Sequence, residues 1–326
     1  MNPQSDKSIV SILGLTQVIA FFVVSFSVPT IFNSYHRYLE LFSHFRFQYF
    51  VFSLLCTVLF LIYKNYKSAA LMALVFSLNS IYVLPWYVNL EEGRGDNAVS
   101  SLKIIHSNVN TANESYKKVI ALIKEENPDI VLLQEASALW VNQLASIEKT
   151  YPYKKANPRA DNFGIAIFSK YPFESIEEIY SGVVDIPSLK VDLMLGGQKI
   201  TLISTHPVPP ISADFYRSRN AQLKQIAAIV KTIQNPVILI GDLNVSMWSS
   251  DYDELEKTTA LVNARKGFGI LPTWPTMLPI AMIPIDHCLL SSEFKVDNIK
   301  LGKDIDSDHL PLVLTLSLNL IRKRDF

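Results

Sequence analysis

The feature that most constrains this chain is a set of three long apolar runs within its first 90 residues. The runs cover residues 9–32, 49–63 and 69–88, none contains a Lys, Arg, Asp or Glu, and Phe45 and Phe47 precede the second. A membrane-spanning helix needs about 20 predominantly apolar residues, and the second run is the shortest of the three. A cleaved signal peptide has a shorter apolar core and is not followed by two further runs. The sequence therefore predicts three transmembrane helices.

The basic residues around these runs bear on their orientation. With three spans, the N-terminus and the second connection lie on one side of the membrane. The two sides carry equal numbers of basic residues, namely Lys7, Lys64 and Lys67 against Arg37, Arg46 and Arg94. The close Lys64/Lys67 pair in a very short loop favours a cytoplasmic N-terminus. That orientation places the C-terminal part of the chain outside the cytoplasm.

The polar stretch EEGRGDNAVS, residues 91–100, is typical of a linker. It divides the chain into a membrane anchor, residues 1–90, and a domain, residues 101–326, which is large enough for a full hydrophobic core. The domain holds 24 basic and 25 acidic residues, so it lacks the basic footprint of a protein that grips long DNA through its backbone. Two cysteines, Cys56 and Cys288, form neither a disulfide framework nor a zinc site.

Apolar strand patterns outnumber helical patterns in the domain. We expect amphipathic helices over 114–129 and 213–233, and strands over 102–110, 130–135, 163–170, 237–240, 285–291, 294–302 and 310–318, with a hairpin over 189–206. The hairpin turns at Gly196-Gly197, a strong two-residue turn signal. Because hairpins are mixed with crossovers, the pattern favours an α+β fold with two packed sheets and helices outside, rather than a doubly wound parallel sheet.

Polar side chains follow these strands at the point where each strand ends. After strand 237–240 come Asp242 and Asn244, which are two residues apart and leave the same face of an extended chain. Five more clusters lie at strand ends: Asn108 with Asn110, Gln134 with Glu135, Thr205 with His206, Asp286 with His287, and Asp308 with His309. Each alone is also typical of a cap or a turn. Six of them predict a ligand site, because strand ends bring side chains from distant segments together.

These residue types fit metal-assisted hydrolysis of a phosphate ester. Mg²⁺ prefers oxygen ligands, which Glu135, Asp242 and Asp308 supply as carboxylates. The amides of Asn108 and Asn244 can donate hydrogen bonds to phosphate oxygens.

Two histidines complete the predicted chemistry. His309 oriented by Asp286 can deprotonate water, and His206 can polarise the phosphoryl group. The chain lacks the HExxH and CxxC patterns of zinc sites, and it has no nucleophile elbow or Gly-rich phosphate loop.

The ordered set of Asn108, Gln134-Glu135, Thr205-His206, GDLN, IDH and SDH resembles the endonuclease/exonuclease/phosphatase superfamily. This superfamily includes DNase I-like nucleases, abasic-site endonucleases, inositol polyphosphate phosphatases and neutral sphingomyelinases. The resemblance covers residues 101 to about 320. It is closer to bacterial membrane-anchored members, through HPVPP, GDLNVSMWS, PTWPT and PIDHCLLS. It implies a four-layer α/β sandwich, a Mg²⁺- or Mn²⁺-dependent site and a bacterial cell-membrane location.

The resemblance also implies a role for each matching residue. Glu135 resembles the principal metal ligand, with Asp308 and Asn108 beside it, whereas Asp242 and Asn244 match the pair around the scissile phosphate. Whether that Asp binds metal or activates water differs between members.

Three further matches and two departures concern the same motifs. Asp286 and His309 match the Asp–His pair, and His206 matches a histidine placed against the phosphate. Asp306 and Leu310 depart from the related anchored members, which are often basic after this His. The departures add negative charge and remove a phosphate contact.

Two residues outside the motifs keep alternative roles. In the helix after His206, Arg219 falls on the stripe that faces the core, where it can hold a substrate phosphate or form a structural ion pair. Trp274, expected to be exposed on a Pro-bounded loop, can stack on a base, touch lipid or pack.

The sequence thus favours a membrane-anchored, divalent-metal-dependent phosphoesterase that acts on a small or lipid-linked substrate. The alternative is a nuclease that degrades DNA or RNA. A non-catalytic membrane-binding module is disfavoured, because the carboxylates, amides and histidines are all present. The expected partners are the lipid bilayer and a phosphate-ester substrate, with no protein partner evident.

Overall fold

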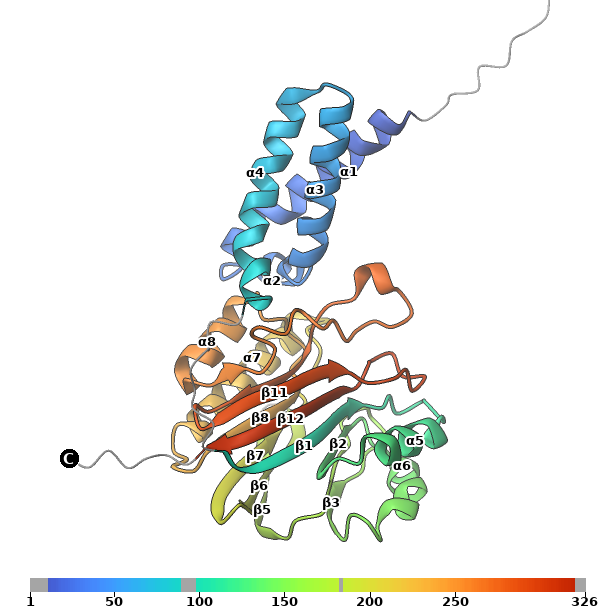
Figure 1. Cartoon of the computed structure of the whole chain (residues 1–326), viewed down its shortest axis with the longest axis vertical. Helices are drawn as coiled ribbons and strands as arrows, with labels where there is room; N and C mark the ends of the chain where they lie inside the picture. The colour runs from blue at the N-terminus through green and yellow to red at the C-terminus, as the bar shows by residue number, and fades with distance from the viewer. Residues whose placement is uncertain (1–10, 89–97, 182–183, 320–326) are drawn as a thin grey trace, which may run out of the picture. The chain divides into compact units, whose positions relative to one another are not determined.

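The computed structural model contains two compact units, Met1–Pro85 and Trp86–Phe326, and each is described by itself (Figure 1). The residues that it describes are 11–88, 98–181 and 184–319. Residues 9–10 of the first apolar run and residues 91–97 of the expected linker lie outside the described residues. The last residues of that expected linker already belong to the first strand, which begins at Ala98.

The N-terminal unit consists of helices. They are α1 (Ile12–Ser27) continued by η1 (Val28–Phe32), α2 (Arg37–Ser43), α3 (Arg46–Ile62), and α4 (Tyr66–Val83) continued by η2 (Leu84–Trp86). Two continuous helices, Ile12–Phe32 and Tyr66–Trp86, are long and apolar enough to cross a membrane. The α2–α3 pair, bent by 63°, is a third candidate if it is taken as one span. The described residues thus hold two or three candidate spans.

Arg46 is the first residue of helix α3. We expected it in the connection between the first and second apolar runs. The Arg46 Nη1 donates to the Asn79 side-chain oxygen over 3.2 Å, and the Asn79 amide donates to the Ser27 hydroxyl over 2.8 Å. The guanidinium also lies 4.0 Å from the centre of the Tyr82 ring. All three helices α1, α3 and α4 share this buried polar cluster. Inside this unit the guanidinium thus has an amide oxygen and an aromatic ring as its polar contacts.

The second unit contains two six-stranded sheets (Figure 1). The first has the strand order β11-β12-β1-β2-β4-β3 and the second β5-β6-β7-β8-β10-β9. The strands are β1 (Ala98–Asn108), β2 (Ile130–Gln134), β3 (Tyr153–Asn157), β4 (Ile165–Ser169), β5 (Phe173–Ser181), β6 (Val184–Leu195), β7 (Gln198–Ser204), β8 (Val237–Asp242), β9 (Val262–Asn263), β10 (Asp286–Leu290), β11 (Phe294–Leu301) and β12 (Leu312–Asn319). The helices are α5 (Tyr116–Glu126), α6 (Ala138–Gln143), η3 (Leu144–Ile147), α7 (Ala213–Val230), α8 (Ser250–Thr259) and η4 (Pro279–Ala281).

Strand alternation divides the apolar residues between two cores. In β1, Leu102 and Ile104 point between the sheets, where they pack in one cluster with residues such as Leu202 of the second sheet. Ile105 points to the outer face of the first sheet and packs with Trp140 of α6 and with residues of α5. Helices α7 and α8 pack on one another beside the second sheet (Figure 1). The expected α+β fold, a four-layer sandwich of two packed sheets between helices, is confirmed.

Candidate active site

Strand register brings the predicted site residues to one edge of the sandwich. In the first sheet, β1 and β2 are parallel, and Asn108 lies beside Gln134 at their carboxyl ends. In the second sheet, β8 and β10 are antiparallel, and Asp242 lies opposite Asp286. Successive side chains of a strand such as β2 enter the two different cores, so a shift of the register by one residue would exchange them between the cores.

Gln134 joins the ends of the two sheets. Its side-chain oxygen accepts the backbone N–H of Asp242 over 2.8 Å, and its amide N–H donates to the Thr205 carbonyl, also over 2.8 Å. Gly241 permits this approach, since a Cβ on it would lie 1.9 Å from the Thr205 oxygen. The sheets therefore meet through backbone groups next to Asp242.

Asp286 lies between two histidines. Its Oδ2 accepts a hydrogen bond from the His309 Nδ1 over 2.8 Å, and its Oδ1 accepts one from the His106 Nε2 over 3.0 Å. The His309 Nε2 then faces the Asp242 Oδ2 at 3.7 Å. All four side chains are buried. The Asp286–His309 pair thus presents one ring nitrogen to the centre of the site.

Burial and charge act in opposite directions on this pair. Burial disfavours ionised Asp286, but the charge of His309 and the His106 hydrogen bond outweigh it and hold the pKa of Asp286 well below its usual value. Burial likewise disfavours charged His309, but the charges of Asp286 and Asp242 raise its pKa to about 10. His309 therefore holds its proton near neutral pH.

Asn108 connects one carboxylate from the end of each sheet, Glu135 and Asp242. Its amide N–H donates to the Glu135 Oε1 over 2.9 Å and to the Asp242 Oδ2 over 3.3 Å. Glu135 has a left-handed backbone conformation, with φ of 58°, which is uncommon for a residue with a side chain. Thr111 holds it there, because its backbone N–H donates to the Glu135 Oε2 and its hydroxyl donates to the Glu135 carbonyl. Such a held conformation aims the half-buried carboxylate into the site.

Asp308 is a second half-buried carboxylate of the site. Its Oδ1 accepts a hydrogen bond from the Asn110 amide over 3.0 Å, and its Oδ2 accepts one from the indole N–H of Trp274 over 3.1 Å. Trp274 was expected to be exposed, but it is half-buried, with its ring 6.4 Å from the His309 ring. The loop that carries Trp274 is therefore part of the site wall.

His206 and Asn244 flank Asp242. The His206 Nε2 lies 3.4 Å from the Asp242 Oδ2. Burial lowers the pKa of His206, but the hydrogen bond to Asp242 and its charge raise it above the ordinary value overall. The Asn244 backbone N–H donates to the Asp242 Oδ1 over 2.9 Å, and its side-chain amide donates to the Pro207 carbonyl over 2.9 Å. In this arrangement Asn244 orients Asp242.

Arg219 makes its contacts behind the site. Its Nη1 donates to the Asn244 carbonyl over 3.0 Å, and its Nη2 lies 3.4 Å from the Asp251 Oδ2. The side chain is fully buried. These are the contacts of a structural ion pair, the alternative that the sequence left open, so we assign Arg219 to positioning and not to phosphate binding.

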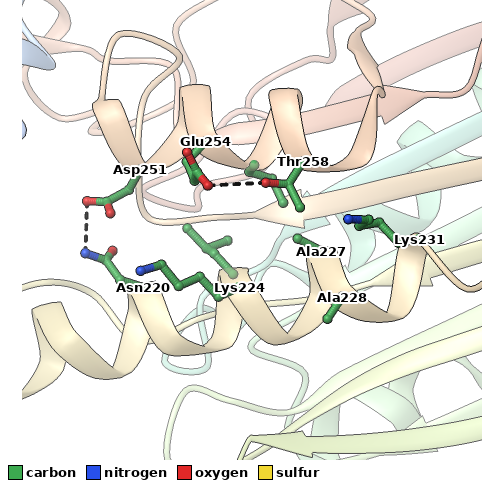
Figure 2. Close-up of a pocket in the computed structure, with 10 residues that line it drawn as sticks. Asn220, Lys224, Ala227, Ala228, Lys231, Asp251, Glu254 and Thr258 are labelled. Atoms are coloured by element: carbon green, nitrogen blue, oxygen red, sulfur yellow. Dashed lines mark hydrogen bonds between the residues drawn. The ribbon is translucent and has the colours of Figure 1, made fainter.

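A groove of about 400 Å³ lies between α7 and α8 (Figure 2). Lysines line it on the α7 side, Lys224 and Lys231, and acidic residues line it on the α8 side, Asp251 and Glu254. It includes none of the residues at the strand ends, and it borders the site only through Asp251, the partner of Arg219.

The donor set fits a hard divalent cation. Glu135 and Asp308 are half-buried carboxylates at the strand ends, and Asp242, Asp286 and His309 offer ligand atoms within 4.8 Å of one another. Oxygen ligands of this kind suit Mg²⁺ or Mn²⁺. Asp286 and the His309 Nδ1 are bonded to each other, whereas Glu135 and Asp308, with Asn108 beside Glu135, are the ligands that the sequence predicts.

Sequence reasoning missed His106. It lies two residues before Asn108, and this spacing places both side chains on one face of β1. That spacing was the available signal, but a single polar residue inside an apolar strand is more often a core residue. Asp306, which was expected to add negative charge, forms an ion pair with Lys118 and a hydrogen bond with Ser115.

Several solved structures share the fold of the second unit. D. rerio TDP2 complexed with a single-strand DNA product is 20% identical, with a TM-score of 0.58 over 67% of this chain and 99% of that chain. Sphingomyelinase C from Streptomyces griseocarneus is 18% identical, with a TM-score of 0.50 over 67% of this chain and 99% of that chain. A conserved protein from Enterococcus faecalis V583, described as functionally unknown, is 18% identical, with a TM-score of 0.57 over 67% of this chain and 100% of that chain.

No curated protein shows a significant match to this chain. The sequence model of the Endonuclease/Exonuclease/phosphatase family matches residues 105–309, which is more than half of the chain and runs from within β1 to His309. The chain therefore belongs to the Endonuclease/Exonuclease/phosphatase family, whose members are metal-dependent hydrolases of phosphate esters.

Proposed function

We propose that the chain is a membrane-anchored phosphodiesterase that requires Mg²⁺ or Mn²⁺. The observation that carries this proposal is the Asp286–His309 pair, whose second ring nitrogen, Nε2, faces Asp242 beside the half-buried carboxylates of Glu135 and Asp308. A charged donor, a nearby carboxylate and a candidate cation site are together what hydrolysis of a phosphate ester needs.

In this proposal His309 stays protonated and donates a hydrogen bond to the substrate. Asp286 fixes the ring through Nδ1, so the Nε2–H points into the site and can donate to a phosphoryl oxygen. Because the pKa of His309 is raised to about 10, the ring carries its positive charge at neutral pH. A buried positive donor stabilises the negative charge that develops on the phosphoryl oxygens in the transition state.

Asp242 is then the group placed to take a proton from water. Its Oδ1 is held by the Asn244 backbone N–H, which leaves Oδ2 among the donors Asn108 and His206. The water oxygen forms a new bond to phosphorus, one ester P–O bond breaks, and the leaving oxygen takes up a proton. Asn108 also donates to Glu135, so one amide sets the spacing of both carboxylates.

A divalent cation held by Glu135 and Asp308 would act as a Lewis acid on the phosphate when bound. Asn108, Asn110 and Thr111 hold these carboxylates in place through hydrogen bonds. The protein's own contribution is thus to hold two half-buried carboxylates in place through hydrogen bonds.

The near-zero charge of residues 101–326 favours a small or lipid-linked diester over a long nucleic acid. The candidate spans support attachment to a membrane. The Lys64/Lys67 pair supports a cytoplasmic N-terminus, with the catalytic unit outside the cytoplasm of a bacterial cell. Protease digestion of intact spheroplasts tests this side, because only an extracytoplasmic catalytic unit is cleaved there.

The full chain in detergent tests the activity. Hydrolysis is followed with Mg²⁺ or Mn²⁺ on a chromogenic diester, plasmid DNA, RNA and sphingomyelin vesicles, for the wild type and His309→Ala. We expect metal-dependent turnover that falls by about 10²–10⁴-fold in the variant. Asp253→Asn, on the exposed face of α8, is the control and should retain activity. Preference for plasmid DNA or RNA would favour the nuclease alternative, and equal activity of wild type and His309→Ala would contradict the proposed site.

A further inference from the structure

One segment of the catalytic unit is unusual in its composition. Residues 267–285 contain no Lys, Arg, Asp or Glu, although charged residues make up 18% of the chain. Within the segment, Trp274 and Ile283 form an antiparallel bridge. Residues 275–282 are the loop that this bridge closes, and Figure 1 shows it in orange, projecting beyond the sheets. We call these eight residues the apolar loop.

The side chains at the tip of the apolar loop are exposed to solvent. Met277 is 83% exposed, Ile280 64% and Leu278 52%. Among the residues described between 98 and 319, Ile211 is the one other large apolar side chain that is more than 52% exposed, at 78%, and Leu139 of α6 follows at 50%. Ile211 lies in the loop that follows His206, a site residue. Within the described residues 98–319, the four most exposed large apolar side chains thus lie on two loops next to site residues, and such a gathering marks an interaction surface.

The base of the apolar loop is bonded to the catalytic segment. Thr276 donates from its backbone N–H to the Asp308 carbonyl over 3.0 Å, and from its hydroxyl to the Ser307 carbonyl over 2.8 Å. Trp274, one of the two bridge residues, donates from its indole N–H to the Asp308 carboxylate. Whatever surface the loop tip contacts is therefore held next to Asp308 and His309.

The course of the chain indicates which surface the tip of the apolar loop contacts. The backbone carbonyl of Trp86 accepts hydrogen bonds from the N–H groups of Gly267 (3.1 Å) and Gly269 (2.8 Å), at the start of the charge-free segment. Trp86 is also the last residue of Tyr66–Trp86, one of the helices apolar enough to cross a membrane. Within the catalytic unit, the segment is thus bonded to Trp86, the residue at which the chain passes from a candidate span into this unit. Met, Leu, Ile and Trp without charges are suited to the bilayer interface.

We propose that the apolar loop inserts its tip into the bilayer interface, so that the active site acts on phosphodiesters in lipid headgroups. The second part of this inference rests on the proposed function, since it names the substrate class of the same site. The first part does not, because bilayer contact by Met277, Leu278 and Ile280 can be measured without any turnover.

The first test measures contact in the full chain, reconstituted in lipid nanodiscs. A bimane probe is attached to Leu278→Cys and, as a matched control, to Leu139→Cys on α6, whose side chain is 50% exposed against 52% for Leu278. The native Cys56 and Cys288 are buried. The wild type, treated with the same probe, gives the background labelling. We expect brominated lipids to quench the Leu278 probe at least twofold more than the Leu139 probe. Equal quenching of the two probes would overturn the proposal.

The second test measures substrate class with a Met277→Ser/Leu278→Ser/Ile280→Ser variant. We expect the ratio of turnover on phospholipid vesicles to turnover on a soluble chromogenic diester to fall about tenfold. An unchanged ratio in a variant with an unchanged melting temperature would overturn the assignment to lipid headgroups. If the Leu278 probe is quenched but the wild type hydrolyses no diester, bilayer contact stands and the proposed function fails.

Discussion

The side-chain oxygen of Gln134 accepts the backbone N–H of Asp242 over 2.8 Å, and this bond links the ends of the two sheets at the active site. The other end of the same amide donates to the Thr205 carbonyl. Gln134 is fully buried. If an apolar residue replaces it, the Asp242 N–H and the Thr205 carbonyl lose this hydrogen-bond partner at a place that is closed to water. The position of Asp242 relative to Asn108 therefore depends on a residue that need not touch substrate.

Gln134→Met should reduce stability and activity together. Leaving two buried backbone groups without partners costs about 1–3 kcal/mol each, and Asp242 is no longer fixed. Denaturant unfolding and kcat on a chromogenic diester measure the two effects. Gln143→Met, at the exposed end of α6, is the matched control. Loss of stability in both variants alike would contradict this role of Gln134.

Gly241→Ala tests the close approach of the sheets. A Cβ at Gly241 would lie 1.9 Å from the Thr205 oxygen and 2.7 Å from the Gln134 amide nitrogen, so backbone must move. We expect a loss of about 3 kcal/mol in the free energy of unfolding, at the upper end for overpacking, and a loss of activity. Gly197→Ala, in the β6–β7 turn, meets nothing within 4 Å and should keep its activity. Normal activity in Gly241→Ala would show that the approach is not required.

His106 should act through Asp286 as a positioning residue. His106→Ala removes the hydrogen bond to the Asp286 Oδ1 while leaving the His309 bond in place. Loss of an outer partner of this kind costs about 10–100-fold in activity, and we expect it in kcat with little change in KM. His106→Gln keeps a side-chain N–H donor and should recover part of the rate. Equal activities of His106→Ala and wild type would contradict the role.

The raised pKa of His309 makes the stability of the metal-free protein depend on pH. The ordinary value is 6.5 and the folded value is about 10, so the folded state binds the proton more tightly. The stabilisation is complete below pH 6.5 and is lost as the pH rises through about 10. Thermal melting in EDTA should therefore fall across this interval more steeply in the wild type than in His309→Gln. Parallel curves for the two proteins would contradict the shift.

Much of the fold follows from the sequence because its central strands are apolar throughout. β2 and β8 are buried along their whole length, and both were expected at nearly their observed bounds. The peripheral elements were missed. β3 (Tyr153–Asn157) is an edge strand with no fully buried side chain, and α8 (Ser250–Thr259) is short and acidic. Their positions depend on pairing with β4 and packing on α7, which no local pattern shows.

The candidate site divides in the same way. The Asp286–His309 bond and the position of Glu135 beside Asn108 agree with the motif order. The burial of Arg219 on the Asn244 carbonyl could not be derived, because helical periodicity gives the inward face and not the partner. Arg46 was placed in a connection for a related reason. Only its tertiary partner, Asn79, shows why a charge lies inside the helical unit.

The most direct test of the account is a metal titration of the full chain and Glu135→Gln, with hydrolysis of a chromogenic diester as the readout. Glu125→Gln, an exposed residue on α5, is the matched control. The account predicts turnover that saturates with Mg²⁺ or Mn²⁺, vanishes in EDTA, and falls at least about 10²-fold in Glu135→Gln alone. Turnover that persists in EDTA, or a Glu135→Gln variant with normal metal dependence, would contradict the assignment of Glu135 to the metal.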